Sequence, residues 1–220
     1  MSVPDSSPRA ATVAVTADII GSRELIDRAA AQRDIDAAVA RVQSDRPRAL
    51  RALVPTVGDE LQGVYPSLEA ALEAVLLLRL ALPDGVECRF GLGVGPVGTV
   101  PSASGEIAEG PGWWAAREAI DALHAKQVRA QPNARTWVAA SDDADESTRR
   151  AVRFANAYVW SRDELVGAMT ARTRRLVYGR CLGRTQAELA ATEGISQSAV
   201  SQALAAAGAG AIVAGFRELA

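Results

Sequence analysis

Two aspartates in separate apolar segments, Asp18 and Asp59, are the residues of this sequence best suited to chemistry. Asp18 lies near the end of ATVAVTADII, and Asp59 lies in TVGDELQGVY between two strand-like runs. Paired carboxylates bind a hard divalent cation such as Mg²⁺ or Mn²⁺, and the backbone of Gly21 and Ser22 offers N–H groups to a phosphate. The competing interpretation is structural, because Gly-Asp is a favoured hairpin dipeptide and Asp18 could simply orient a turn.

The elements that must position these aspartates follow from the hydrophobic pattern. It predicts, in order, a buried strand at 11–20, an amphipathic helix capped by Ser22, strands at 49–57 and 61–65, a helix between Ser67 and Pro83, and a glycine-rich strand at 86–97. This β-α-β-β-α-β order is the split arrangement of ferredoxin-like and palm domains, an α+β fold. A right-handed crossover makes the first two strands parallel with the third between them, so both aspartates are expected at one sheet edge.

The rest of the chain predicts a second, smaller domain. After a loop at 98–110 we expect a helix over WWAAREAIDALHAKQ, a strand at 136–140 and a solvent-adapted acidic stretch, SDDADESTRR. The first domain, 11–160, then ends near Trp160. Ser161 and Glu164 form a capping-box pair, which predicts a new helix running to about Arg180 at the start of an all-α domain, 161–220.

A helix-turn-helix is predicted between Arg184 and Gly208, with Gly194 in the turn and Ser196 capping the second helix. Small polar side chains on the outward face of that helix suit base edges in a major groove: Gln197, Ser198, Ser201 and Gln202. Arginines suited to phosphate contacts precede it: Arg172, Arg174, Arg175, Arg180 and Arg184. The alternative is a packing or dimerisation module with a solvated arginine face.

Composition narrows the class of protein. An apolar fraction of 49%, 23% charged residues and a net charge of −2 indicate a globular chain and argue against a wholly basic nucleic-acid binder. The longest apolar run, 70–82, is too short to span a bilayer and contains Glu73 and Arg79, and no secretory signal is recognised. Two distant cysteines predict neither a disulfide framework nor a zinc knuckle, so a cytoplasmic location is expected.

Other catalytic schemes lack their residues. His124 is the only histidine, which excludes an HExxH zinc motif and favours a surface position over a catalytic base. Neither a GxSxG elbow nor a GxxxxGK[ST] phosphate loop is present, and GLGVGPVG lacks the dinucleotide pattern GxGxxG.

Three segments, TADIIGSRE, TVGDELQGVY and RFGLGVGPV, resemble in order and spacing the core segments of class III nucleotidyl cyclases. The Gly-Asp-Glu turn is also similar to the hairpin signature of diguanylate cyclases, and GPGWWAAREAI resembles a later cyclase helix. Over about residues 11–220 the chain is more specifically similar to the SatD family, a cyclase-like α/β sandwich followed by a helix-turn-helix domain.

The cyclase resemblance assigns roles to matching positions. Asp18 and Asp59 match the metal ligands, with the Ile19 carbonyl as a further ligand. Gly21 and Ser22 match the phosphate-facing turn, and Arg117 matches the arginine that stabilises transition-state charge. Two positions depart from the pattern: Pro55 replaces the lysine that reads the purine, and Trp113 replaces the asparagine partnered with the arginine. Losing a positioned donor costs on the order of a hundred-fold in rate, which favours binding without efficient turnover.

Trp113 and Trp114 could stack on a nucleotide base, or they could be core or dimer-interface aromatics. The overall expectation is a cytoplasmic, homodimeric DNA-binding regulator whose cyclase-like domain binds a nucleoside triphosphate or related nucleotide with Mg²⁺ or Mn²⁺. Two alternatives stay open: an active metal-dependent nucleotidyl cyclase or transferase, and a degenerate cyclase fold that serves as a dimerisation scaffold.

Overall fold

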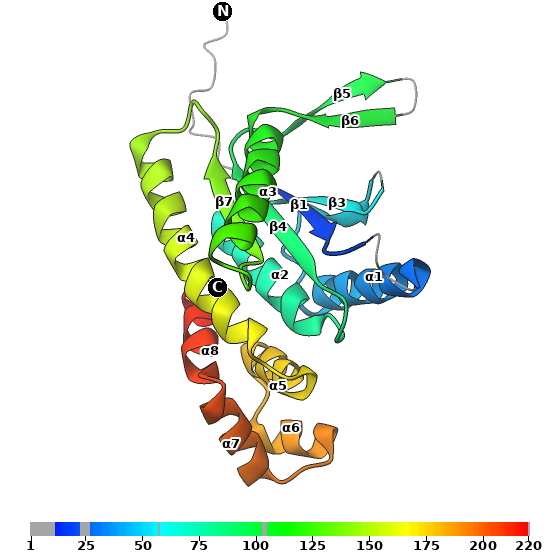
Figure 1. Cartoon of the computed structure of the whole chain (residues 1–220), viewed down its shortest axis with the longest axis vertical. Helices are drawn as coiled ribbons and strands as arrows, with labels where there is room; N and C mark the ends of the chain where they lie inside the picture. The colour runs from blue at the N-terminus through cyan, green and yellow to red at the C-terminus, as the bar shows by residue number, and fades with distance from the viewer. Residues whose placement is uncertain (1–11, 23–26, 57, 103–104, 220) are drawn as a thin grey trace, which may run out of the picture.

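The computed structural model describes residues 12–22, 27–56, 58–102 and 105–219, and its centre is a five-stranded sheet in the order β2-β3-β1-β4-β7 (Figure 1). The strands are β1 (Val13–Ile19), β2 (Arg51–Pro55), β3 (Glu60–Tyr65), β4 (Cys88–Val94) and β7 (Thr136–Ala140). Strand β3 lies between β1 and β2 and is antiparallel to both. The first two strands are therefore parallel, as the split topology predicted. Strand β7 extends the sheet by pairing in parallel with β4.

Helices cover both faces of the sheet (Figure 1). Alternate residues of β1, from Val13 to Ile19, pack into the core that also contains α1 (Arg28–Asp45) and α2 (Leu68–Ala81). The opposite face carries α3 (Pro111–Arg129), where Ala14 of β1 packs with Trp113 and Ala116. The period-2 alternation of β1 thus separates two apolar layers.

Glycines of β4 allow α3 to approach the sheet closely. A Cβ atom added to Gly91 would lie 2.3 Å from the carbonyl oxygen of Ala116, and one added to Gly93 would lie 1.9 Å from the carbonyl oxygen of Gly112. Both distances are far below van der Waals contact with rigid backbone. The closely spaced glycines of RFGLGVG therefore serve helix-to-sheet packing.

Helix α4 (Glu146–Gly167) lies along the β7 edge of the sheet. Its Asn156 side chain accepts a hydrogen bond from the backbone N–H of Val138 and donates one to the Val138 carbonyl, both at 2.9 Å. The amide thus satisfies backbone groups that an edge strand leaves unpaired.

The core continues from the sheet into the C-terminal helices. Every residue of α2 from Ala70 to Leu80 is buried, because α5 packs over the side of α2 that faces away from the sheet. The helices at this end are α5 (Ala171–Cys181), α6 (Gln186–Glu193), α7 (Gln197–Ala206) and α8 (Ala209–Glu218). Phe216 anchors α8 in the same apolar cluster as the sheet residues.

Three local predictions are wrong. The helix predicted to start at Ser161 does not, because α4 runs through this position and ends at Gly167, and α5 has its own N-cap at Thr170. The N-cap of α1 is Asp27, whose side chain accepts the Ala30 N–H at 2.8 Å, and not Ser22. The loop predicted at 98–110 is a hairpin of β5 (Gly98–Ser102) and β6 (Gly105–Glu109).

Within the described ranges no single helix is long and apolar enough to cross a bilayer, and the pair α7 and α8 reaches that length and composition only with a bend of 80° between them.

Candidate functional site

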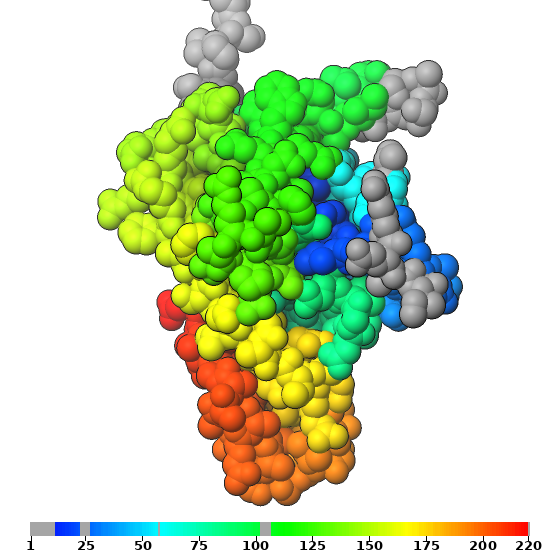
Figure 2. All heavy atoms as spheres, in the orientation of Figure 1, coloured from blue at the N-terminus to red at the C-terminus, as the bar shows by residue number. Residues whose placement is uncertain are grey.

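Asp18 lies at the end of β1 between two charged cross-strand neighbours. The register pairs it with Glu60 of β3 on one side and with Arg89 of β4 on the other. Asp59 immediately precedes Glu60 in the β2–β3 turn, so both aspartates lie at one sheet edge, where the topology predicted them. In Figure 2, β1 reaches the molecular surface between the green of α3 and the cyan of β3.

The pKa of Asp18 reflects its burial and the charges of its neighbours. Arg89 Nη2 lies 3.2 Å from Asp18 Oδ2, whereas the buried Oδ1 has no hydrogen-bond partner within the described residues. Burial raises the pKa of Asp18, the Arg89 guanidinium lowers it, and the negative charge of Asp59 raises it again. The Asp59 effect means that the two carboxylates are close enough to repel each other.

Helix α3 contributes basic groups to the same edge. Arg117 forms an ion pair with Glu60, and His124, which is exposed as predicted, contacts Arg89 through Nδ1. We call Asp18, Asp59, Glu60, Arg89, Arg117 and His124 the sheet-edge cluster. The structure thus brings together three of the residues singled out by sequence, Asp18, Asp59 and Arg117.

Glu60 and Arg89 are members that the sequence analysis missed. Both stand in segments that had been recognised, TVGDELQGVY and RFGLGVGPV. Each lies directly opposite Asp18, so the strand register would have identified them. That register depends on where each strand begins, which the sequence pattern fixes poorly.

The donor set is sparse for a metal held by protein alone. Among the described residues there is no group of three or more His, Cys, Asp or Glu side chains arranged to hold a metal ion. Mg²⁺, however, takes one or two carboxylates together with substrate phosphates and waters. Asp18, with one buried oxygen lacking a partner, and Asp59 fit that mode of binding.

The expected phosphate turn lies beside the cluster but not at a helix start. Gly21 adopts a left-handed conformation with φ of 65°, and α1 begins only at Arg28. Gly21 and Ser22 therefore lack the helix N-terminus that the sequence analysis gave them. Ile19 ends β1 with its side chain buried.

The two adjacent tryptophans have different surroundings. Trp113 is 6% exposed, packs against Ala14 and Val64, and has Arg51 5.2 Å from its ring centroid. It is a core residue, so the predicted stacking of a base on Trp113 does not fit this structure. Trp114 is 62% exposed.

The second site proposed from sequence lies at the far end of the molecule, on α6 and α7 (Figure 1). Gly194 joins these helices in a left-handed conformation with φ of 66°, and the Ser196 side chain caps α7. The predicted outward face of α7 is exposed: Gln197, Ser198, Ser201 and Gln202. Val200 and Leu204 form its buried face.

The arginines around α7 differ in their contacts. Arg175 pairs with Glu193 through two hydrogen bonds of 2.8 and 2.6 Å, and Arg172 lies 4.0 Å from the same carboxylate. Arg184 is exposed, whereas Arg174 turns inward to Asp84. Arg172, Arg175 and Arg184 are thus all exposed, and the first two share the carboxylate of Glu193.

Residues 12–212 match the SatD family model. Similar solved structures include a bacterial light-regulated adenylyl cyclase (14% identity, TM-score 0.43, 59% of this chain and 43% of that one). Others are the adenylyl cyclase CyaB from P. aeruginosa (17%, TM-score 0.39, 51% and 72%) and the guanylate cyclase domain of RhGC from Catenaria anguillulae in complex with GTP (16%, TM-score 0.38, 51% and 73%). No curated protein matches this chain.

Proposed function

The chain belongs to the SatD family, and we propose that it is a DNA-binding regulator whose α+β part binds a nucleoside triphosphate with Mg²⁺ or Mn²⁺. The observation that carries the nucleotide half is the meeting of Asp18 and Asp59 at one sheet edge. Arg89 and Arg117 flank them and could face phosphate oxygens. Carboxylates for the cation and guanidinium groups for the anion are the complementary parts of a metal–triphosphate site.

Binding the metal requires an exchange of partners. Arg89 now supplies the positive charge beside Asp18, so a divalent cation must take over that role. The released guanidinium is then free for a phosphate oxygen of the same ligand. When bound, the ion would neutralise phosphate charge, and Asp18 and Asp59 would hold it.

Slow or absent turnover is part of the proposal. Pro55 is exposed and has no donor for a purine, and Trp113 is buried where a transition-state donor is expected from the cyclase pattern. Each missing donor costs on the order of a hundred-fold in rate. An active cyclase or transferase is therefore the less favoured alternative.

Calorimetric titration with a non-hydrolysable GTP or ATP analogue and Mn²⁺ tests the nucleotide half. Wild-type protein should bind only with the metal present, and Asp59→Asn should weaken binding at least about ten-fold, the loss of one charge-assisted ligand. Asp143→Asn is the matched control, because it removes an exposed carboxylate in the segment after β7. Absence of binding would contradict the proposal. In a separate assay with ATP or GTP, pyrophosphate release that Asp59→Asn abolishes would establish the enzyme instead.

The DNA half is supported by the exposed polar face of α7 and by the arginines beside it. In a helix-turn-helix the second helix enters the major groove and presents such side chains to base edges. Gln is suited to bidentate contacts with adenine. We therefore propose that Gln197, Ser198, Ser201 and Gln202 read DNA sequence, and that Arg172, Arg175 and Arg184 contact phosphates.

Selection from a random-sequence duplex pool followed by binding assays tests this half. The double substitution Gln197→Ala with Gln202→Ala should weaken binding to the selected duplex by at least about ten-fold, because each base contact contributes about 1–3 kcal/mol. Gln131→Ala, at an exposed position after α3, should have no effect. Equal binding by the double variant and wild type would contradict the assignment.

A homodimer is proposed because apolar side chains gather on exposed parts of α3 and the β5–β6 hairpin. Val100 and Ile107 are cross-strand partners in the hairpin and both are exposed, as is Trp114. Such side chains are enriched in protein interfaces. Sedimentation equilibrium should show a dimer, and Trp114→Ala should raise its dissociation constant. The competing scaffold function, with this dimer and no ligand, is favoured by the Asp18–Arg89 ion pair and would be supported if no nucleotide bound.

A further inference from the structure

A small polar cavity lies where the sheet meets the C-terminal helices. Its volume is about 80 Å³, and its walls come from the α2–β4 connection, the start of β7, and the segment from the end of α4 into α5. One water molecule needs roughly 10–15 Å³ of cavity volume on this measure, so the space is sufficient for a group the size of a phosphate. None of its lining residues belongs to the sheet-edge cluster.

The charges of this cavity are unevenly placed. Three arginines line it with largely buried side chains: Arg79 is 7% exposed, Arg135 12% and Arg174 15%. The two acidic lining residues are at the rim, with Asp84 73% exposed and Glu87 53% exposed. The interior is therefore positive, and the balancing carboxylates extend into solvent.

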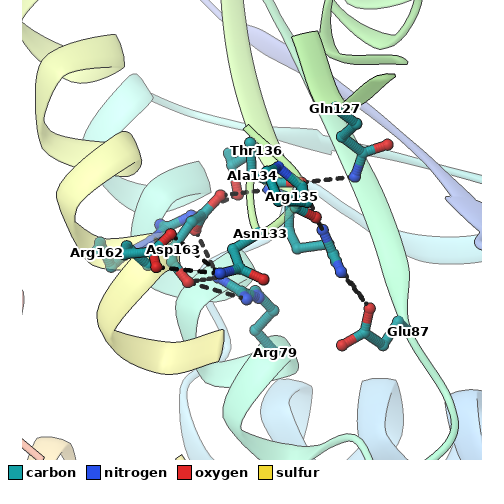
Figure 3. Close-up of polar contacts among 11 residues, drawn as sticks. Arg79, Glu87, Gln127, Asn133, Ala134, Arg135, Thr136, Arg162 and Asp163 are labelled. Carbon is teal, nitrogen blue, oxygen red and sulfur yellow. Dashed lines mark hydrogen bonds and ion pairs between the residues drawn. The ribbon is translucent and has the colours of Figure 1, made fainter. Parts of the chain in front are cut away.

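Buried groups behind the wall add to this excess of positive charge (Figure 3). Asp163, fully buried, accepts hydrogen bonds from Arg79 at 2.7 Å and from Arg162 at 2.9 Å. One carboxylate thus serves two buried guanidinium groups, and Arg162 Nη1 has no partner among the described residues. Burial lowers the pKa of Arg79, Asp163 raises it, and the positive charges of Arg162 and Arg135 lower it further.

The rim carboxylates are the replaceable partners. Arg174 Nη2 donates to Asp84 Oδ1 at 2.8 Å, and Arg135 Nε donates to Glu87 Oε2 at 2.9 Å. Both arginines are also fixed by backbone carbonyls, Arg174 by Leu82 and Arg135 by Ala134. The guanidinium groups are held in place, whereas exposed carboxylates lose little free energy when they leave such a pair.

We propose that this cavity binds a tetrahedral dianion, either inorganic phosphate or the phosphate group of a small phosphomonoester. Its oxygens would take the places of Asp84 and Glu87 on Arg174 and Arg135, with Arg79 at the base of the cavity. Arginine is suited to this role because its planar fork matches phosphate oxygens. A bound anion connects the α2–β4 segment, β7 and α5, so it ties the sheet to the C-terminal helices. The site is independent of the proposed nucleotide and DNA sites.

Thermal unfolding and calorimetry of the full chain at pH 8 test this, with inorganic phosphate, sulfate and methyl phosphate titrated at an ionic strength held constant with NaCl. A phosphomonoester is a dianion at this pH. Phosphate should give a saturable calorimetric binding curve. It should also raise the unfolding temperature with the logarithm of its concentration, as ligand linkage requires, beyond the effect of the excluded salt sulfate. Binding of methyl phosphate as well would identify phosphomonoesters as ligands, and its exclusion would identify free phosphate.

Two variants locate the anion. Arg174→Gln should abolish the saturable calorimetric binding of phosphate, or weaken it at least about ten-fold, by removing a charge-assisted donor. Asp84→Asn should tighten binding several-fold, because it removes the carboxylate that competes for Arg174, and this gain does not depend on a destabilised protein. Arg153→Gln, an exposed arginine of α4, is the control for net charge. Equal phosphate affinity in wild type, Arg174→Gln and Asp84→Asn, or no saturable phosphate effect, would overturn the proposal.

Discussion

At the scale of single residues, Asp18 balances burial against opposite charges. Replacing Asp59 by Asn removes a negative neighbour and should lower the pKa of Asp18, whereas Arg89→Met removes a positive neighbour and should raise it. A pH titration of the Asp18 carboxyl carbon by NMR measures both shifts. Asp143→Asn should leave the midpoint unchanged. A midpoint that Asp59→Asn leaves unmoved would show that the two carboxylates do not interact.

The raised pKa of Asp18 also makes the free energy of unfolding depend on pH. The folded-state pKa of Asp18 lies above its ordinary value of 3.8, so the folded protein binds more protons than the unfolded chain between the two values. The contribution of Asp18 to the free energy of unfolding therefore falls as pH rises through that window. A metal ion that binds the carboxylate should reverse this trend.

Asp163 is the residue on which the buried arginines depend. Asp163→Asn keeps the shape of the side chain but leaves Arg79 and Arg162 without an anion. Removing one partner of a buried ion pair costs about 3–5 kcal/mol, so the free energy of unfolding in denaturant should fall by that amount. Glu146→Gln breaks the exposed pair with Arg153 and should cost less than about 1 kcal/mol. Equal midpoints for the two variants would contradict this account.

At the scale of elements, the contact between α3 and β4 depends on glycine. Gly93→Ala places a methyl group against rigid backbone and should lower the free energy of unfolding by about 3 kcal/mol or more. Gly210→Ala in α8 meets no atom within 4 Å and should raise stability by up to about 1 kcal/mol, as alanine favours a helix. Denaturant unfolding of both variants compares them directly, and similar losses would show that close packing is not the cause.

Short sequence signals predicted helix caps, turns and strands correctly where contacts between residues close in the sequence determine the structure. Ser67 and Ser196 cap their helices, Gly194 forms the turn, and the strand at 136–140 has its predicted bounds. The predicted helix start at Ser161 was wrong because a capping-box pattern does not by itself end the preceding helix. Arg162 and Asp163, buried against distant partners, lie in the uninterrupted α4.

The candidate site was likewise only partly predictable from the sequence. Topology placed Asp18 and Asp59 at one edge, because a right-handed crossover depends on element order alone. Arg89 and Glu60 required the strand register. The buried position of Trp113 required the close approach of α3 to the sheet, which depends on Gly91 and Gly93 in a different element of the chain.

At the scale of the whole molecule, the apolar core contains residues on both sides of residue 160, so we predict that the chain cannot be divided there. Ending it there would remove the helices that cover α2 and expose leucines and Val75 between Ala70 and Leu80. We expect that shortened chain to aggregate or to lack a cooperative unfolding transition, as judged by gel filtration and circular dichroism. The double variant Gln197→Ala with Gln202→Ala should remain folded, because both side chains are exposed. A monomeric, cooperatively folded 1–160 fragment would contradict the shared core.

A helix such as α2, with no side facing water, also restricts how a gene of this kind can be rearranged. Grafting α5 to α8 onto an unrelated sensor would expose apolar side chains on these helices and on α2, because each part buries the apolar side chains of the other. Recombination should therefore pass the two halves on together, and residues facing each other across α2 should change in concert between relatives.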